Sequence, residues 1–181
     1  MRIIAGSRKS RLLKSLPGLS TRPTLDKVKE AAFGRLGPWI EGKRVLDLFA
    51  GSGNIGLEAL SRGASHCWFV DGSKEAIHII QDNIDALEFN EASDVYRMDA
   101  FQACRYLKNK GLSFDFIYCD PPYGKLDLDK LWIALLPLTH KDTRLILEHP
   151  SLDLDHLNPA YRLEKHHNYG TVHLYELRRN T

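Results

Sequence analysis

The residues best suited to chemistry are an aspartate, two prolines and a tyrosine that follow an apolar run. Residues 114–124 read FDFIYCDPPYG, so Asp120, Pro121, Pro122 and Tyr123 come directly after a stretch typical of a buried strand. Two consecutive prolines cannot continue a central strand, and Pro121 favours extended backbone at Asp120. We therefore expect a rigid loop at the carboxyl end of a strand, where open α/β sheets bind ligands.

These residue types suit methylation of an amine on an aromatic ring. Such a nitrogen is a poor nucleophile because its lone pair is delocalised, and acceptors that hold its N–H groups let it pyramidalise toward a methyl sulfonium. The Asp120 carboxylate and the Pro121 carbonyl are acceptors of this kind. Tyr123 offers a flat face for an extruded base, and such stacking is worth about 1–3 kcal/mol. No covalent nucleophile is needed, and Cys119 is expected to pack within the strand.

A second candidate segment, residues 44–56, reads RVLDLFAGSGNIG, an apolar strand that runs into a glycine-rich turn and then a helix. Gly51 permits the tight turn, Gly53 lets backbone approach a ligand, and Gly56 lets the helix pack on the strand. This spacing occurs in nicotinamide, flavin and S-adenosylmethionine sites, and a glycine turn can also be purely structural. The context of strand, turn and helix favours a ligand site.

Two aspartates help to choose between these cofactors. Asp71 ends the next strand, about 20 residues on, and suits a carboxylate that accepts hydrogen bonds from ribose hydroxyls. Asp47 lies inside the strand, two residues before the loop. A carboxylate there can face the cationic end of S-adenosylmethionine, whereas it would repel a diphosphate. The pair favours the methyl donor.

The elements that must position these residues follow an α/β pattern, with helical periodicity alternating with short β-branched or aromatic runs. Thr24 is expected to cap a helix that runs to about Ile40, Ser73 starts another, and a further helix covers 127–136. The last two strands are joined by only Asn168–Gly170, too few residues for a parallel crossover. They should form an antiparallel hairpin at the end of an otherwise parallel sheet. The seven expected strands are 44–49, 67–71, 94–98, 114–119, 143–149, 161–166 and 172–177.

Length and charge bound the remaining possibilities. The chain has 181 residues and a net charge of +2, with room for one domain, organised as a basic extension and helix over 1–40 and a core over 41–181. Through Arg44 it carries 11 Lys and Arg against 3 Asp and Glu, a net +8, and the remainder carries 14 against 20, a net −6. This asymmetry predicts a polyanionic partner for the N-terminal segment, with nucleic acid ahead of a membrane.

Three scattered cysteines, no apolar leader and no membrane-length apolar run predict a cytoplasmic protein. The histidines lack metal-ligand spacing, so we expect no metal site. Glu148 and His149 end another strand and could touch the rim of the pocket, but their positions indicate no specific role.

Taken together, DLFAGSGNIG, the aspartate at 71, MDA at 98–100 and DPPYG resemble an amino-group S-adenosylmethionine-dependent methyltransferase. More narrowly, RIIAGSRKSRLL followed by TRPTLDKVKEAAFGRL resembles the N-terminus of the bacterial RsmD family, which methylates guanine N2 in small-subunit ribosomal RNA. The resemblance covers essentially the whole chain. Asp71 stands where glutamate is common in the family.

The resemblance implies a Rossmann-like methyltransferase fold and a division of roles among the residues. Asp71 would bind the ribose of the cofactor, Asp99 and Ala100 would border its adenine, and residues 120–123 would form the target-amine site. The full candidate cofactor set is Asp47, Phe49, Gly51, Gly53, Gly56, Asp71, Asp99 and Ala100. The residues expected to contact RNA are Arg2, Arg8, Lys9, Arg11, Lys14, Arg22 and Thr24.

The sequence thus predicts methyl transfer from S-adenosylmethionine to a guanine N2 of 16S ribosomal RNA, within a partly assembled small subunit and without an obligate protein partner. Methylation of DNA adenine N6 or of a protein glutamine is the alternative within the class, because those enzymes also place an acid or amide before PPY. A nicotinamide oxidoreductase is disfavoured because no substrate domain fits in the chain. An RNA-binding protein without catalysis would need neither the glycine loop nor DPPY.

Overall fold

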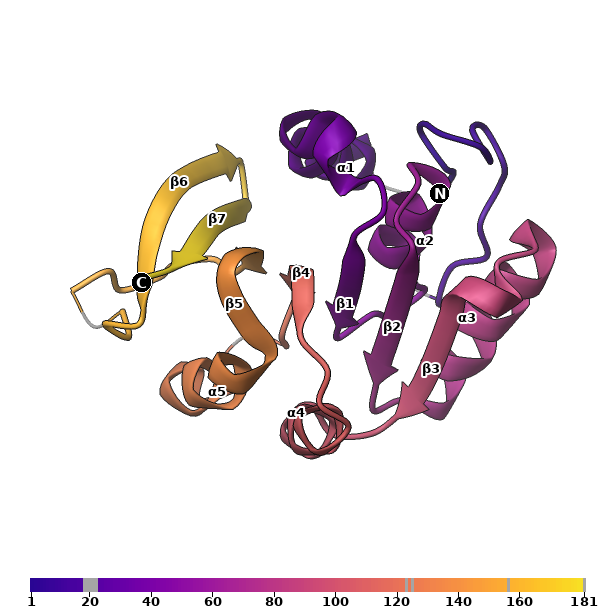
Figure 1. Ribbon diagram of the computed structural model, residues 1–181. Helices are drawn as coiled ribbons and strands as arrows, with labels where there is room; N and C mark the ends of the chain where they lie inside the picture. Colours follow the sequence, from indigo (N-terminus) through magenta and orange to yellow (C-terminus); the bar gives the residue numbers. More distant parts are fainter. Residues whose placement is uncertain (18–22, 123, 125, 156, 181) are drawn as a thin grey trace.

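The computed structural model describes residues 1–17, 23–122, 124, 126–155 and 157–180, with the side chains of 23–25 left out. Its centre is a seven-stranded sheet in the order β3-β2-β1-β4-β5-β7-β6 (Figure 1). The first five strands are parallel, whereas β7 is antiparallel to both β5 and β6. This arrangement confirms the predicted mostly parallel sheet with a C-terminal antiparallel hairpin. The strands are β1 Arg44–Leu48, β2 His66–Asp71, β3 Ser93–Arg97, β4 Phe114–Cys119, β5 Thr139–Glu148, β6 Tyr161–Tyr169 and β7 Val172–Arg179.

Helices cover both faces of the sheet. Buried apolar side chains from α1, α2 and α3 pack on one face, and those from α4 and α5 pack on the other (Figure 1). Three of the helices begin with a side-chain cap: Ser73 for α3, Asp99 for α4 and Asp127 for α5. The helices are α1 Pro23–Leu36, α2 Asn54–Ser61, α3 Lys74–Leu87, α4 Ala100–Asn109 and α5 Leu128–Leu135, with short 3₁₀ turns at Gly37–Ile40, Asn90–Ala92 and Leu136–Leu138.

Some predicted boundaries are wrong. The first helix begins at Pro23 and ends at Leu36, because Gly37 turns to a φ of +50° and the chain continues as a 3₁₀ turn. The expected connection 168–170 is shorter, since Asn168 and Tyr169 pair with His173 and Val172 across the hairpin. Pairing between β6 and β7 makes both strands longer than the alternation of polar and apolar residues predicts.

The order of the strands determines where a ligand can bind. The chain moves outward from β1 to β2 and β3 and then returns to β4 on the other side of β1, so the topology switches direction between β1 and β4. Open α/β sheets bind ligands outside the carboxyl ends of the strands at such a switch point. The glycine loop follows β1 and Asp120 follows β4, so both predicted motifs lie there.

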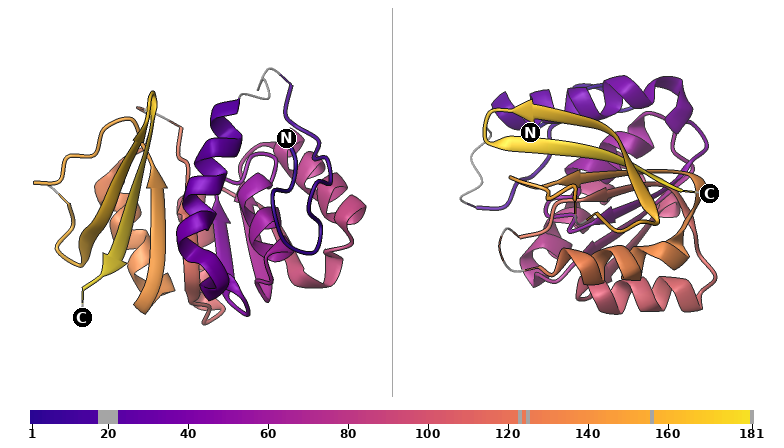
Figure 2. Two further views of the ribbon diagram at one scale, coloured as in Figure 1. Left: turned by 90° about the horizontal axis from the view of Figure 1, so that it is seen from above. Right: turned by 90° about the vertical axis from the view of Figure 1, so that its left-hand side faces the viewer.

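The N-terminal arm, residues 1–17, folds back on itself through an antiparallel bridge between Arg2 and Leu12. It packs beside α2 and α3, at the opposite end of the molecule from the β6–β7 hairpin (Figures 1 and 2). Within the described residues, no helix is both long enough and apolar enough to cross a lipid bilayer.

Candidate active site

The glycine loop joins β1 to α2 through a run of left-handed backbone. Phe49, Gly51 and Gly53 have φ angles of +72°, +58° and +77°. Glycine adopts such angles freely, whereas Phe49 adopts its angle at a cost of about 1–3 kcal/mol that the surrounding structure must offset. Two hydrogen bonds hold it there, because the amides of Phe49 and Ala50 both donate to the Val70 carbonyl, at 3.0 and 2.9 Å.

Gly56 allows α2 to approach the sheet. A Cβ atom at this position would lie 2.3 Å from Cε1 of Phe69 and 2.5 Å from the Sγ of Cys67, both on β2. Because these atoms belong to the buried core, any larger residue would push the helix away from the strand.

The carboxylates of Asp71 and Asp99 organise the loops that follow β2 and β3. Asp71 accepts hydrogen bonds from the amides of Gly51 and Ser73, both at 2.8 Å, and so ties the glycine loop to the end of β2. Asp99 accepts from the first amides of α4, with 2.9 Å to Phe101. Each acid therefore has a structural task besides any ligand contact.

These loops enclose a cavity of about 610 Å³, which is within the range of small-molecule sites. Asp71 and Asp99 lie on one side and Asp120 on the other. The cavity is lined by Phe49, Val70, Asp71, Gly72, Met98, Asp99, Ala100, Asp120, Pro121 and Pro122. Four of the eight predicted cofactor residues line this cavity: Phe49, Asp71, Asp99 and Ala100. A fifth, Gly51, donates its amide to Asp71 and so joins two of the loops around the cavity.

A second cavity of about 160 Å³ adjoins the first, and Phe49 and Asp120 line both. Three acidic side chains border it, those of Asp47, Asp120 and Glu148. Its remaining lining comes from the arm, α1, the glycine loop and α2, through Met1, Val28, Phe49, Ala50, Gly51, Ser52, Asn54 and Ile55, and from Tyr118 on β4. A space bordered by several carboxyl groups favours a cationic ligand.

Asp47 is 2% exposed and accepts a hydrogen bond from the Gly56 amide at 2.8 Å. Burial, opposed by this hydrogen bond and assisted by the charge of Asp71, raises the pKa of Asp47 to about 7. The carboxylate thus supports the turn into α2 while lining the acidic cavity. A group of this kind is ready to ionise when a cation arrives.

The Asp47→Asn variant should be more stable than the wild type when no ligand is bound. Because the folded pKa lies above the usual value of 3.8, the native state holds the extra proton between about pH 4 and pH 7, and stability falls as pH rises through that window. Asparagine keeps the acceptor oxygen for Gly56 but does not ionise. Above pH 7 we expect a gain of up to about 4 kcal/mol, shrinking to nothing near pH 4. Urea unfolding at pH 5 and pH 8 measures it, and an equal effect at both values would contradict the assignment.

Asp120 and Glu148 are the other two acidic residues that border the second cavity. Although Asp120 is open to both cavities, desolvation and then the charges of Glu148 and Asp47 raise its pKa to about 8. Glu148, at the end of β5, is 7% exposed and accepts a hydrogen bond from the Tyr118 hydroxyl at 2.9 Å. The sequence placed Glu148 at a strand end without a role, and the structure places it on the wall of the acidic cavity.

The predicted RNA contacts fall into three groups. Arg8, Arg11 and Lys14 bind the C-terminal half of α3: Arg8 donates to the Leu87 carbonyl at 2.8 Å, and Lys14 pairs with Asp82 at 2.8 Å. Arg11 donates to the Ala86 carbonyl at 2.9 Å.

Arg2 and Lys9 are exposed, and a role for them in RNA binding stays a prediction. Arg22, the side chain of Thr24 and the proposed stacking residue Tyr123 lie outside the described residues, and their roles also stay predictions.

A buried polar network that the sequence did not indicate joins the arm to the glycine loop. The Lys29 ammonium, fully buried on α1, donates to the Arg2 carbonyl and to Oδ1 of Asn54 at 2.7 Å, and lies 3.2 Å from Glu58. Glu58, also fully buried, accepts from the amides of Ile4 and Ala5. Burial lowers the pKa of Lys29, and the charge of Glu58 opposes that shift. The network holds the arm, α1 and α2 together.

Asn83 makes a second link. Its side chain is 1% exposed and lies between the arm and the glycine loop. The amide nitrogen donates to the carbonyls of Lys14 and Ser52, at 3.1 and 3.0 Å, and the amide oxygen accepts from the Lys14 backbone at 2.8 Å. Asn83 therefore links the arm directly to the glycine loop.

The sheet order, the C-terminal antiparallel hairpin and the position of the cavities define the fold of the S-adenosylmethionine-dependent methyltransferases. The solved structure described as "Putative methyltransferase yhhF from Escherichia coli" has the same fold, with a TM-score of 0.85 and 28% identity over 99% of this chain and 97% of that one.

The family described as "Conserved hypothetical protein 95" matches residues 1–178, and the chain belongs to this family. The Bacillus subtilis protein named "Putative rRNA methyltransferase YlbH" is 44% identical over 151 residues, which are 82% of each chain. "Ribosomal RNA small subunit methyltransferase D" of Haemophilus influenzae is 36% identical over 68% of this chain, and the match spans 64% of that relative's length.

Proposed function

We propose that this protein transfers a methyl group from S-adenosylmethionine to the exocyclic N2 amine of a guanine in 16S ribosomal RNA, in the cytoplasm. The observation that carries the proposal is the position of Asp120. It stands where the two cavities meet, at the carboxyl end of β4 and at the switch point of the sheet. The names of the two relatives support ribosomal RNA as the acceptor, and one of them specifies the small subunit.

The two cavities fit the two ends of the cofactor. The larger one has room for an adenosine, with Asp71 and Asp99 as carboxylates that could accept from its polar hydrogens. The smaller one offers Asp47, Asp120 and Glu148 to the positively charged amino-acid end. When bound there, the cofactor supplies a methyl group activated by a sulfonium. The raised pKa values of Asp47 and Asp120 are then lowered by the cation.

Asp120 and Pro121 orient the acceptor amine. The Asp120 carboxylate and the Pro121 carbonyl accept from the two N–H bonds, which holds the nitrogen lone pair toward the methyl carbon. With the donor bound, this lone pair would form the new N–C bond as the C–S bond breaks, the electron pair of that bond would stay on sulfur, and the nitrogen would lose one proton. Because the cation lowers the pKa of Asp120, the side chain is ionised in the complex, and its carboxylate is placed to take this proton. Fixed positioning contributes the rest of the acceleration.

Methylation of DNA adenine N6 or of a protein glutamine remains the alternative, because Asp120 and the two prolines could hold either amine. Incubation with S-adenosylmethionine labelled in the methyl group distinguishes them. The acceptors are ribosomal RNA, partly assembled small subunits, duplex DNA and a release factor. We expect label in the ribosomal RNA, with more label in the assembled particles than in naked RNA, and label only in DNA or in the release factor would overturn the proposal.

A further inference from the structure

Three arginines lie side by side on neighbouring strands at the C-terminal end of the sheet. Arg144 of β5 pairs in register with Arg178 of β7, which in turn pairs with Arg162 of β6. Residues directly opposite each other on adjacent strands point to the same face, and like charges in such positions are destabilising. Lys165 follows on that face, opposite Glu176. We call Arg35, Arg144, Arg162, Lys165 and Arg178 the hairpin basic face, with Arg35 contributed by α1.

The cations of this face crowd one another. The Arg144 guanidinium lies 4.3 Å from the ring centre of Trp39, and its Nε atom is buried without a hydrogen-bond partner among the described residues. Burial and then the charge of Arg178 lower the pKa of Arg144. Burial, followed by the charges of Arg35 and Lys165, likewise lowers the pKa of His167. The face therefore carries repulsion that a bound anion would relieve.

Two carboxylates offset part of this charge. Glu164 pairs with Arg162 at 2.8 Å, and Glu176 stands opposite Lys165 in the ladder. Five cations against two carboxylates leave an excess of positive charge. In the arm, Arg8 and Lys14 pair with the carboxylates of Glu88 and Asp82, whereas Arg144 and Arg178 on the hairpin basic face donate to the backbone carbonyls of Arg35 and Asp142, at 3.5 and 3.2 Å.

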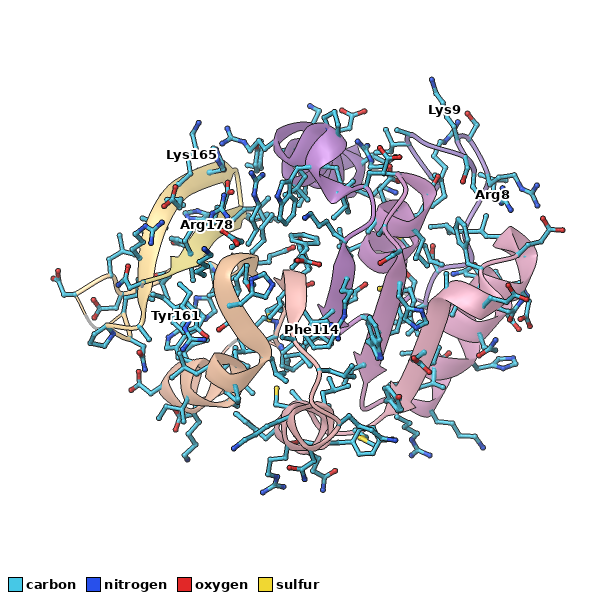
Figure 3. The ribbon with its side chains drawn as sticks, in the orientation of Figure 1. Arg8, Lys9, Phe114, Tyr161, Lys165 and Arg178 are labelled. Atoms are coloured by element: carbon cyan, nitrogen blue, oxygen red, sulfur yellow. The ribbon has the colours of Figure 1, made fainter. Side chains whose placement is uncertain are left out.

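The hairpin basic face lies on the side of the sheet that α1 covers, and Lys165 and Arg178 occupy the part of the hairpin nearest to that helix (Figure 3). The hairpin also reaches the active-site edge. Leu174 pairs with Glu148 at the carboxyl end of β5, so the turn between β6 and β7 lies at the same edge as Asp120 (Figure 2). The basic face begins below that edge: Lys165 lies level with Ile146, two residues before Glu148 on β5, and the row of Arg144, Arg178 and Arg162 lies two residues further from the edge.

We propose that the hairpin basic face binds the phosphate backbone of the acceptor RNA while the target base lies at Asp120. This inference rests on the proposed function, since it takes RNA as the partner. Cations spaced along a sheet suit a row of phosphates, and such contacts position a substrate without reading its sequence. The arm then has a different role, in supporting the glycine loop.

The test compares two double variants that remove the same charges from opposite faces. Lys165→Gln with Arg178→Gln alters the hairpin basic face, whereas Arg105→Gln with Lys108→Gln removes one arginine and one lysine from the exposed side of α4. Fluorescence anisotropy would measure the binding of each protein to a fragment of small-subunit ribosomal RNA over a range of salt concentrations. The hairpin variant should lower the slope of log K against log salt by about 1.4–1.8, and the α4 variant should not change it.

The single variant Lys165→Gln guards against misfolding. The Lys165 side chain is exposed and makes no hydrogen bond or ion pair with the described residues, and a neutral glutamine adds no like charge opposite Glu176. It should weaken RNA binding while S-adenosylmethionine binding, measured by calorimetry, stays at the wild-type value. If wild-type protein methylates ribosomal RNA and both hairpin variants bind RNA with the wild-type slope, the inference is wrong and the proposed function stands. If wild-type protein methylates only DNA or protein, both fail.

Discussion

The Asp120→Ala variant is expected to transfer methyl groups at least a hundredfold, and up to about ten-thousandfold, more slowly than the wild type. The substitution removes both the acceptor that holds the amine and the base that takes its proton, and general-base groups contribute factors of this size. Binding of S-adenosylmethionine should weaken far less, because Asp47 and Glu148 still border the acidic cavity. Single-turnover methylation of small subunits and calorimetry with the cofactor measure the two effects separately.

Asp120→Asn provides the matched comparison. It keeps one acceptor oxygen but cannot take a proton, so its rate should lie between those of the wild type and the alanine variant. Asp129→Ala, on the exposed first turn of α5, controls for the loss of a carboxylate and should leave the rate unchanged. Wild-type rates in Asp120→Ala would show that the amine is held elsewhere.

The Lys29→Met variant should lower the free energy of unfolding by about 3–5 kcal/mol. Lys29 is fully buried, and its removal leaves Asn54 and the Arg2 carbonyl without their shared donor and Glu58 with one cation fewer. Breaking a buried ion pair by deleting one partner costs this much because the other charge stays buried. The arm should also become accessible to proteases, since the Arg2 carbonyl loses its attachment to α1.

Lys27→Met is the control for this prediction. Lys27 lies two residues earlier on the same helix and is exposed, so its replacement should change stability by no more than about 0.5 kcal/mol. Urea unfolding of both variants gives the comparison. Equal midpoints would mean that the buried network does not hold the arm, and its proposed support of the glycine loop would then fail.

The features that could be predicted from the sequence are those that local backbone chemistry determines. Consecutive prolines after a strand place Asp120 on a rigid loop, and glycines 51 and 53 adopt the positive φ angles that a tight turn needs. The alternation of elements likewise predicts the sheet and its final hairpin, because three residues cannot form a parallel crossover.

Contacts between distant segments could not be predicted in this way. Lys29, Glu58 and the Arg2 carbonyl meet only after α1 and α2 have packed together, 27 to 56 residues apart in the chain. One signal was available, because Glu58 stands in the otherwise apolar segment IGLEAL, and a charge inside a buried helix requires a partner. The net charge of +8 up to Arg44 indicated RNA contacts for the arm, yet three of its cations bind α3.

In the folded chain, the positive charge of the N-terminal segment is therefore used differently from what the sequence predicts. The basic arm is used largely in holding the glycine loop and α3, whereas Arg144, Arg162, Lys165 and Arg178 lie together on β5 and the C-terminal hairpin. Three of the 20 acidic residues of the remainder, Asp47, Asp120 and Glu148, border the second cavity, at the place proposed for a cationic cofactor.

Nucleoside analysis of small-subunit RNA tests the central claim most directly. Small subunits from a bacterial strain lacking the corresponding gene would be incubated with labelled S-adenosylmethionine and either the wild type or Asp120→Ala, then digested and examined by mass spectrometry. The account predicts one additional N2-methylguanosine per 16S RNA with the wild type and almost none with the variant. Label on adenine N6, on protein, or at equal levels with both proteins would contradict it.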